Sequence, residues 1–212
     1  MRKITRFLVP VFCICALFIL FGTTAQAKFD KKKAKKNIKV VYKELDDGIL
    51  ATYENNNKFA VKIKAAISYT DFGGTPIQKE VKLNNCLGKG RTMALFFKKP
   101  TNGSGEVVSY SFVKKSFTVA KSLYKDKTKK IKVTTQPELV ECKCLVQNLT
   151  GKELLGINLT FVFYDSRNRI VAVQEASPGC TMPSKAAELV LNYTVAAVPE
   201  RVEIYKNWGY CR

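Results

Sequence analysis

The feature that most constrains the fold of this chain is a hydrophobic pattern with a period of two residues. Between positions 59 and 69, apolar side chains alternate with polar ones such as Lys62 and Lys64. Successive side chains of a strand point to opposite faces of a sheet, so this pattern predicts a strand with one buried and one solvated face. The same pattern returns between Leu155 and Phe163, where Val162 on the second face indicates a more buried strand.

The two predicted strands are followed by the same series of features. An aspartate and a turn come first, at Asp71 and at Asp165, and a cysteine follows fifteen residues later, at Cys86 and at Cys180. This equal spacing indicates an internal duplication. We therefore predict an all-β protein with two tandem antiparallel immunoglobulin-like β-sandwich domains after a signal peptide. The predicted parts are a first domain at 38–120, a basic linker at 121–132 and a second domain at 133–212.

Residues 1–27 have the organisation of an export signal. Three basic residues precede an apolar run from Phe7 to Phe21, and Ala25-Gln26-Ala27 offers a small-x-small cleavage site. A retained membrane anchor is the alternative, but the run is shorter than the roughly 20 residues that span a bilayer. We expect a cleaved signal peptide, no transmembrane span after cleavage, and a secreted or cell-envelope location.

The charge of the chain is strongly positive. It has 36 Lys and Arg against 17 Asp and Glu, a formal net charge of +19, and removal of the three cations of the signal leaves +16. Such a protein attracts polyanions. The basic leader at 28–37 is either a solvated segment before the first strand or a tether to an anionic surface. The candidate anion-binding residues in it are Lys31, Lys32, Lys33, Lys35 and Lys36.

One segment resembles a known family. The sequence Phe161-Val162-Phe163-Tyr164-Asp165, preceded by Asn148 to Lys152, resembles the motif of the bacterial FxLYD family, with Phe163 in place of the motif leucine. The resemblance is clearest over 138–212 and weaker over 38–120. It implies a small extracellular sandwich and no catalytic residues. From the residues themselves, we expect Phe161 to fill the core, and we expect Asp165 and Asp71 to close turns rather than to contact a metal or ligand.

The cysteines carry the only covalent chemistry that the sequence suggests. Disulfides are expected in an exported protein, and the candidates are Cys142, Cys144, Cys180 and Cys211. Reduced core thiols and a zinc site are the alternatives, although C-x-C is tighter than the usual zinc spacing. Cys86 is left as a buried thiol, a free thiol or a bridge to another chain.

The sequence favours a binding or structural role over catalysis. It contains no histidine, no phosphate-binding glycine loop and no nucleophile elbow. We predict no enzyme activity, no cofactor and no metal, and no small-molecule substrate is evident. The expected partner is an anionic cell-wall polymer, bound through the basic surface, or another envelope protein, and nucleic acid could bind only non-specifically. A protein partner could use an anchor cluster of Trp208, Tyr210 and Arg212, although a packed final strand explains these residues as well.

Overall fold

The computed structural model describes residues 29–122, 127–179 and 181–208, and these form antiparallel β-sheets with one short α-helix. The all-β prediction is confirmed. The predicted signal at 1–27 lies outside the described residues. Within the described part of the chain, no helix has the length and apolar character needed to cross a bilayer.

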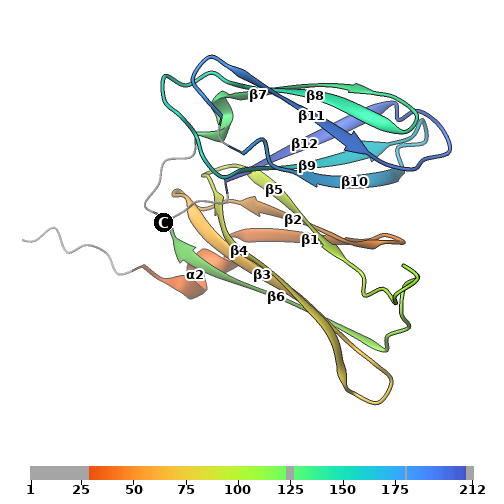
Figure 1. The fold of residues 1–212 in the computed structure, drawn as a ribbon. Coiled ribbons are helices and arrows are strands. Elements are labelled where there is room, and N and C mark those ends of the chain that lie inside the picture. Colours follow the sequence, from red (N-terminus) through yellow and green to blue (C-terminus); the bar gives the residue numbers. More distant parts are fainter. Residues whose placement is uncertain (1–28, 123–126, 180, 209–212) are drawn as a thin grey trace, which may run out of the picture. The chain divides into compact units, whose positions relative to one another are not determined.

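The first half of the protein is a pair of facing three-stranded layers (Figure 1). Strands β1, β2 and β5 form one layer in the order β1-β2-β5, and β4, β3 and β6 form the other in the order β4-β3-β6. The strands are β1 (Ile38–Glu44), β2 (Gly48–Asn55), β3 (Val61–Thr70), β4 (Pro76–Leu87), β5 (Thr92–Lys98) and β6 (Phe112–Lys121).

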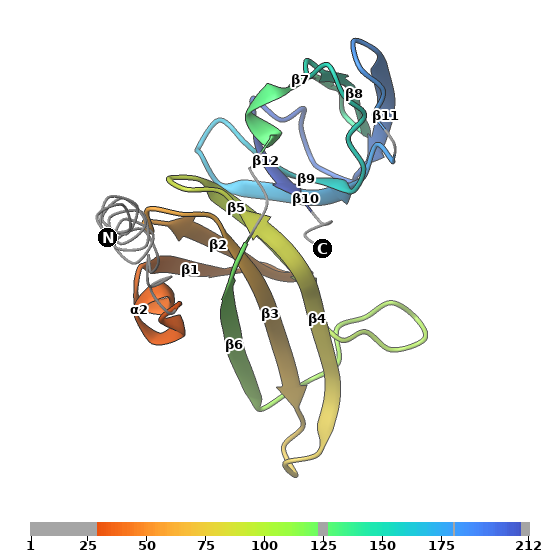
Figure 2. The ribbon, with the colours of Figure 1, turned by 90° about the vertical axis from the view of Figure 1, so that its left-hand side faces the viewer.

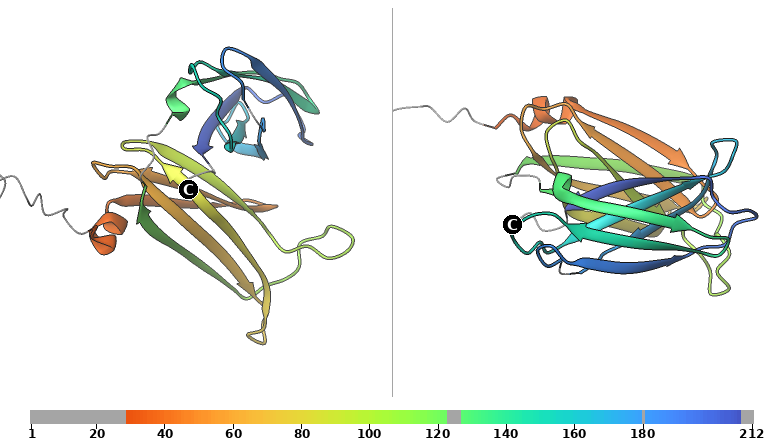
Figure 3. Two further views of the ribbon diagram at one scale, coloured as in Figure 1. Left: turned by 60° about the vertical axis from the view of Figure 1, so that its left-hand side comes forward. Right: turned by 90° about the horizontal axis from the view of Figure 1, so that it is seen from above.

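The second half repeats this arrangement. Its layers have the orders β11-β8-β7 and β10-β9-β12, so each strand takes the place of the strand six numbers before it. Figure 3 shows the strands of the second half, coloured green to blue, in two further views. The 3-10 turn η1 (Thr128–Lys130) precedes the first of its strands. The strands are β7 (Ile131–Pro137), β8 (Glu141–Asn148), β9 (Ile157–Tyr164), β10 (Ile170–Ala176), β11 (Ala186–Asn192) and β12 (Arg201–Trp208).

Equivalent loops repeat as well, at an offset of about 94 residues. The buried amide of Asn55 donates to the carbonyl oxygens of Phe59 and Leu87, at 2.9 and 3.0 Å. Asn148, at the end of β8, donates in the same way to the carbonyl oxygens of Lys152 and Thr181, at 2.8 and 2.9 Å. In each loop, the asparagine amide donates to carbonyl oxygens that the bend after the strand would otherwise leave without a hydrogen-bond partner. The repeated bonds support the duplication inferred from the sequence.

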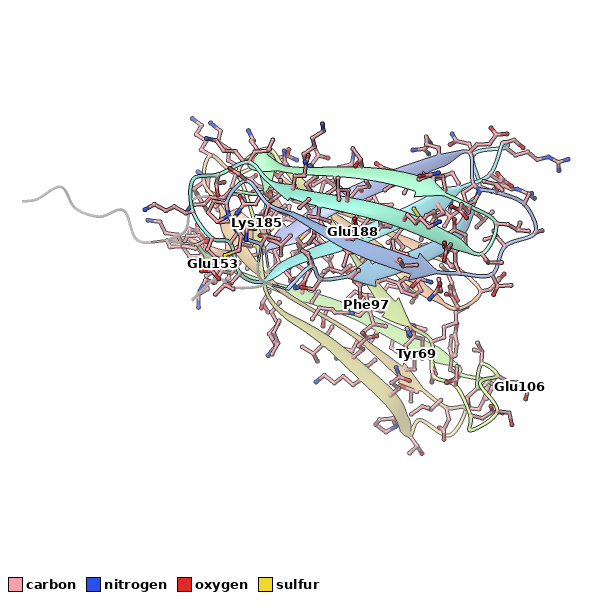
Figure 4. All side chains as sticks on the ribbon, turned by 45° about the horizontal axis from the view of Figure 1, so that its top comes forward. Tyr69, Phe97, Glu106, Glu153, Lys185 and Glu188 are labelled. Atoms are coloured by element: carbon pink, nitrogen blue, oxygen red, sulfur yellow. The ribbon has the colours of Figure 1, made fainter. Side chains whose placement is uncertain are left out.

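Each half has its own apolar core. Between the layers of the first half lie fully buried side chains that include Tyr53, Tyr69 and Phe97, of which the last two are labelled in Figure 4. The core of the second half contains Phe161 and Phe163 of β9. The inward positions alternate along β3 and β9, as the period of two predicts.

The two halves share one six-stranded sheet with the order β10-β9-β12-β4-β3-β6. The link between them is the pair Trp208 and Cys86, which joins the end of β12 to β4. A small apolar cluster also connects the halves. It contains Leu50, Ala94, Phe96, Val162 and Val173. Residues 31–212 together form one compact unit. The division into two domains stays a prediction.

The free edge of β5 is closed by side chains of the second half. The carbonyl oxygen of Ala94 accepts bonds from Thr160 Oγ1 at 2.9 Å and from Asn207 Nδ2 at 2.7 Å. The N–H of Phe96 donates to Glu175 Oε1 at 3.1 Å. An unpaired strand edge carries backbone groups that need partners, and here side chains supply them.

The basic leader contains a short helix. Lys31–Lys36 form the helix α2, which lies beside β1 and β6 (Figure 2). Ala34 is buried, and its carbonyl oxygen accepts a bond from Asn57 Nδ2 at 3.0 Å. The single small apolar residue of the segment therefore fixes the helix to the sheet. The five lysines of the helix are nevertheless exposed to solvent, and their role as a tether to an anionic surface stays a prediction.

Candidate functional site

A set of lysines gathers on the outer side of the sheet β4-β3-β6. Along β3 the inward side chains are buried, and Lys62 and Lys64 are on the opposite face. Residues directly opposite each other on antiparallel strands share a face. The register places Lys114 of β6 and Lys79 of β4 on either side of Ser68. We call this group, Lys62, Lys64, Lys79 and Lys114, the lysine face.

The geometry of the lysine face suits an extended anionic partner. Neighbouring strands are about 4.8 Å apart, so the backbones that carry Lys79 and Lys114 are separated by roughly 10 Å. Lys64, Lys79 and Lys114 are exposed and, among the described residues, form no ion pair. The other positions that the register places on this face are small, polar or apolar, and none of those described is acidic. The positive potential of the face is therefore not cancelled within the face.

Other lysines of the first half make contacts away from this face. Lys99 Nζ lies 3.2 Å from Glu44 Oε1, and Lys115 Nζ lies 5.3 Å from the centre of the Tyr42 ring. Lys35 of α2 stands over Phe117, with 4.6 Å between Nζ and the ring centre. Burial disfavours the charge of Lys99, but the Glu44 carboxylate and Tyr110 together outweigh burial and raise the pKa of Lys99. These lysines contribute to packing as well as to net charge.

The aspartates of the two repeated turns act on the backbone. Asp71 Oδ1 accepts the N–H groups of Gly73 and Thr75, at 2.9 and 2.7 Å. Asp165 Oδ1 accepts those of Arg167 and Arg169, at 3.0 and 2.8 Å. Both carboxylates therefore close the hairpin that follows a central strand.

The remaining residues of the FxLYD-like motif are part of the second half's framework. Phe161 is fully buried in the core. Tyr164 is half-buried, its hydroxyl donates to Glu203 Oε2 at 2.8 Å, and the Arg201 guanidinium lies 3.6 Å from the centre of its ring. Burial, together with the bond to Glu203, raises the pKa of Tyr164. These contacts stabilise β9 against β12.

The prediction that Cys142 and Cys144 form disulfides is wrong. Both are free thiols on the inner face of β8, with 3.7 Å between their sulfurs, whereas a disulfide needs about 2.05 Å. Burial, together with the neighbouring thiol, raises the pKa of Cys144 to about 12. These cysteines are therefore small core hydrophobes. In the described residues, no group of three or more potential ligands could hold a metal.

Cys86, which the sequence left unassigned, is disulfide-bonded. Cys180 and Cys211 lie outside the described residues, so the structure does not test a pairing for them.

The structure describes only one residue of the predicted anchor cluster of Trp208, Tyr210 and Arg212. The backbone of Trp208 ends β12 and pairs with Ile157 and Cys86, so the segment is a final strand up to this residue. Tyr210 and Arg212 lie outside the described residues. The lysine face could not be found from the sequence, because the register of β3 with β4 is needed to place Lys79 on it and the register of β3 with β6 is needed to place Lys114.

No family model matches this chain, and no curated protein matches it. Solved structures that resemble it are a red sea bream transglutaminase, at 12% identity, and the Amycolatopsis orientalis exo-chitosanase CsxA, at 15% identity. The likenesses cover 82% and 84% of this chain but only 30% and 26% of those chains, each with a TM-score of 0.28. At this TM-score they indicate neither a shared fold nor a shared activity.

Proposed function

We propose that this chain is a non-catalytic binding module that acts outside the cytoplasm and associates with anionic polymer through the lysine face. The observation that carries the proposal is the placement of exposed lysines from three neighbouring strands on one sheet surface, where none of the described residues is acidic. A flat cationic surface attracts a polyanion along its length without selecting a particular sequence or monomer.

The setting of this activity rests on two sequence features. The export signal predicted at 1–27 supports delivery across the cytoplasmic membrane. The resemblance of residues 161–165 to the FxLYD motif supports an extracellular sandwich module of a bacterium. An anionic polymer of the cell wall is then the partner that fits both the compartment and the charge.

The experiment compares dextran sulfate with neutral dextran as probes for the exported protein. The affinity for dextran sulfate should fall steeply with salt, because each neutralised anionic group contributes about 0.7–0.9 to the slope of log K against log salt. Neutral dextran should not bind measurably. The triple variant Lys64→Gln, Lys79→Gln, Lys114→Gln should lower the slope by roughly 2–3.

A matched control separates the lysine face from net charge. Lys129, Lys132 and Lys152 are exposed in the second half, and their replacement by Gln removes the same three charges. We expect this control triple to change the slope by less than about 1. Equal effects of the two triples would assign binding to net charge alone and contradict the proposal. So would an affinity that persists at about 0.5 M salt, where the Debye length is only about 4 Å.

One observation favours a protein partner as the second candidate. Near the hairpin end of the same sheet, Phe72 and Phe112 are 79% and 61% exposed. Exposed aromatic side chains are frequent anchors of protein interfaces. Retention of an envelope partner at high salt, with loss on replacement of both residues by Ser, would support this candidate over the polymer.

A further inference from the structure

The turn of the hairpin β3–β4 carries an aromatic side chain that the turn does not need. Phe72 is 79% exposed. The bonds that close this turn come from the Asp71 carboxylate, whose Oδ1 accepts two backbone N–H groups. The equivalent turn of the second half is polar and exposed, with the sequence Ser166-Arg167-Asn168. An exposed aromatic residue is therefore a property of the first-half turn and is not required by the repeated turn geometry.

A second exposed aromatic residue lies beside this turn. The N–H of Ser111 donates to the carbonyl oxygen of Thr70 at 2.9 Å, and the next residue, Phe112, stands opposite Thr70. Phe112 is 61% exposed. Pro76 of β4 stands opposite Thr70 on its other side and is also exposed. We call Phe72, Pro76 and Phe112 the apolar tip, and Figure 2 shows the turn of the hairpin extending past the start of β6.

Two cations of the lysine face follow the apolar tip directly. Lys114 comes two residues after Phe112, so both point to the same side of β6 and are about 7 Å apart along the strand. Lys79 and Lys114 stand on either side of Ser68. Both lysines are exposed and, among the described residues, form no ion pair. The end of this sheet is therefore apolar, with a row of positive charge one step behind it.

This spacing matches the layers of a lipid bilayer. The hydrocarbon core is about 30 Å thick and the whole bilayer about 40–45 Å, so each headgroup layer is roughly 5–8 Å deep. When the apolar tip lies at the edge of the hydrocarbon, Lys79 and Lys114 are at the depth of the lipid phosphates. Lys64 is four residues from Ser68, about 14 Å farther along β3, and stays outside the headgroup layer.

A bilayer with acidic lipids accounts for both parts of this surface. A wall polymer would pair with the lysines but would leave the exposed aromatic side chains without a role. A protein partner would use the aromatic side chains, but lysine is depleted in protein interfaces. Apolar and aromatic side chains beside lysines are the composition of protein surfaces that lie in the membrane interface. The export predicted from residues 1–27 also delivers the chain to the outer side of a membrane.

We propose that the apolar tip inserts into the surface of a bilayer that contains acidic phospholipids, while Lys79 and Lys114 contact the lipid phosphates. The proposal rests on the proposed function, because these cations belong to the lysine face. It adds a membrane as the anionic surface and gives the apolar tip a role. Each lysine close to an acidic bilayer contributes about fivefold to the affinity.

The test is sedimentation of the exported protein with lipid vesicles, after mass spectrometry has confirmed that the apolar segment 1–27 is absent. Vesicles of phosphatidylglycerol and phosphatidylcholine in equal amounts should bind at least ~20-fold more tightly than phosphatidylcholine alone, as two lysines require. The variant Phe72→Ser, Phe112→Ser should weaken binding to the acidic vesicles at least ~10-fold, because less apolar surface leaves water. The affinity of this variant for dextran sulfate should change less than about twofold, since its charge is unchanged.

Two control variants separate the apolar tip from general effects. Leu149 and Val190 of the second half are 58% and 56% exposed, so Leu149→Ser, Val190→Ser removes a comparable exposed apolar surface and should leave vesicle binding unchanged. Lys64→Gln should weaken vesicle binding by less than about twofold, because this lysine lies more than a Debye length from the phosphates. By contrast, Lys79→Gln, Lys114→Gln should weaken vesicle binding about 25-fold.

The depth of the tip can be measured with a tryptophan in place of Phe72. The fluorescence of Phe72→Trp should shift to shorter wavelength on acidic vesicles and should be quenched by lipids brominated on their acyl chains. The original protein, with Trp208 as its single tryptophan, gives the background signal.

Three results would overturn the proposal. The first is no binding to the acidic vesicles at ~1 mM lipid, about tenfold above the concentration at which a single acyl anchor is half bound. If dextran sulfate still binds, this result refutes the membrane and leaves the proposed function standing. The second is equal vesicle binding by Phe72→Ser, Phe112→Ser and the original protein, which would assign binding to charge alone. The third is Phe72→Trp fluorescence that brominated lipids do not quench.

Discussion

The central strands β3 and β9 occupy equivalent places in the two halves, yet the second faces of these strands have opposite environments. On β3 that face carries Lys64 and Ser68 and contributes to the lysine face. On β9 the face carries Thr160 and Val162, which are buried at the junction of the halves. The repeat thus conserves the inward side of the sandwich, and the outward side is where the halves differ in role.

The largest expected effect comes from placing the same side chain at the two equivalent positions. Val162→Lys buries a charge among Leu50, Ala94 and Phe96 and should lower the free energy of unfolding by more than about 4 kcal/mol. Ser68→Lys adds a cation between Lys79 and Lys114 and should cost less than about 1 kcal/mol. Urea unfolding measures both. Similar losses for the two variants would mean that the faces of β3 and β9 are not differently covered.

Removal of the buried loop asparagines should have the next largest effect, and it tests how alike the halves are. Asn55→Ala and Asn148→Ala each leave several backbone groups without a partner and should lower the free energy of unfolding by about 3 kcal/mol. Asn192→Ala, at an exposed position, is the control. If the halves unfold separately, each variant will shift one of two transitions, whereas a single shared transition will show one cooperative unit.

The cysteines give a somewhat smaller contrast between the halves. Reduction of the protein should lower the free energy of unfolding by about 2–3 kcal/mol through the disulfide of Cys86. Cys86→Ala should abolish this dependence on reductant, and the double variant Cys142→Ala, Cys144→Ala should retain it, because these thiols are free. Unfolding with and without reductant, together with mapping of the disulfide by mass spectrometry, checks the prediction. A dependence on reductant that persists in Cys86→Ala would contradict it.

The smallest effect concerns the two repeated turns. The backbone N–H of Arg169, and further its guanidinium, hold the pKa of Asp165 below its ordinary value of 3.8. The pKa of the folded state is depressed, so the stabilisation is present above the unfolded pKa and is lost as the pH falls through the folded pKa. Asp165→Asn should therefore be less stable than the original protein near pH 7, and the difference should vanish in strong acid.

A series of urea unfolding curves over pH 2–7, a range that brackets the carboxylate pKa values near 4, measures this change. Asp71→Asn is the matched variant in the first half. The position that Arg169 has in the second half is taken there by Thr75, which has no guanidinium group. A difference for Asp165→Asn that does not vary with pH would show that the carboxylate charge has no role in the turn.

The sequence allowed prediction of those features that depend on local pattern. The alternation along β3 and β9 indicated which side chains are buried, and the equal distance of fifteen residues from each aspartate to a cysteine indicated a repeat, because both signals act over short stretches of the sequence. The closure of β5 by Thr160, Glu175 and Asn207 was not predictable, since these residues lie 66 to 113 positions from their partners.

Two further features depended on distant contacts in the same way. The helix α2 forms although its sequence is almost entirely lysine, because Ala34 is buried and is bonded by Asn57, 23 positions later. A single bridge, between Trp208 of β12 and Cys86 of β4, places Asn85 and Asn207 where the two halves meet. Charge pattern alone could suggest neither arrangement.

The closure of the β5 edge has a consequence for biosynthesis. A chain that is made from its N-terminus completes β5 well before Thr160, Glu175 and Asn207 have been synthesised. During that interval, the carbonyl of Ala94 and the N–H of Phe96 lack the side-chain partners that they have in the finished protein. An open strand edge of this kind pairs readily with other chains. We therefore expect the growing chain to depend on chaperones until its last strand is complete, and a fragment that ends after β6 to aggregate when it is produced alone.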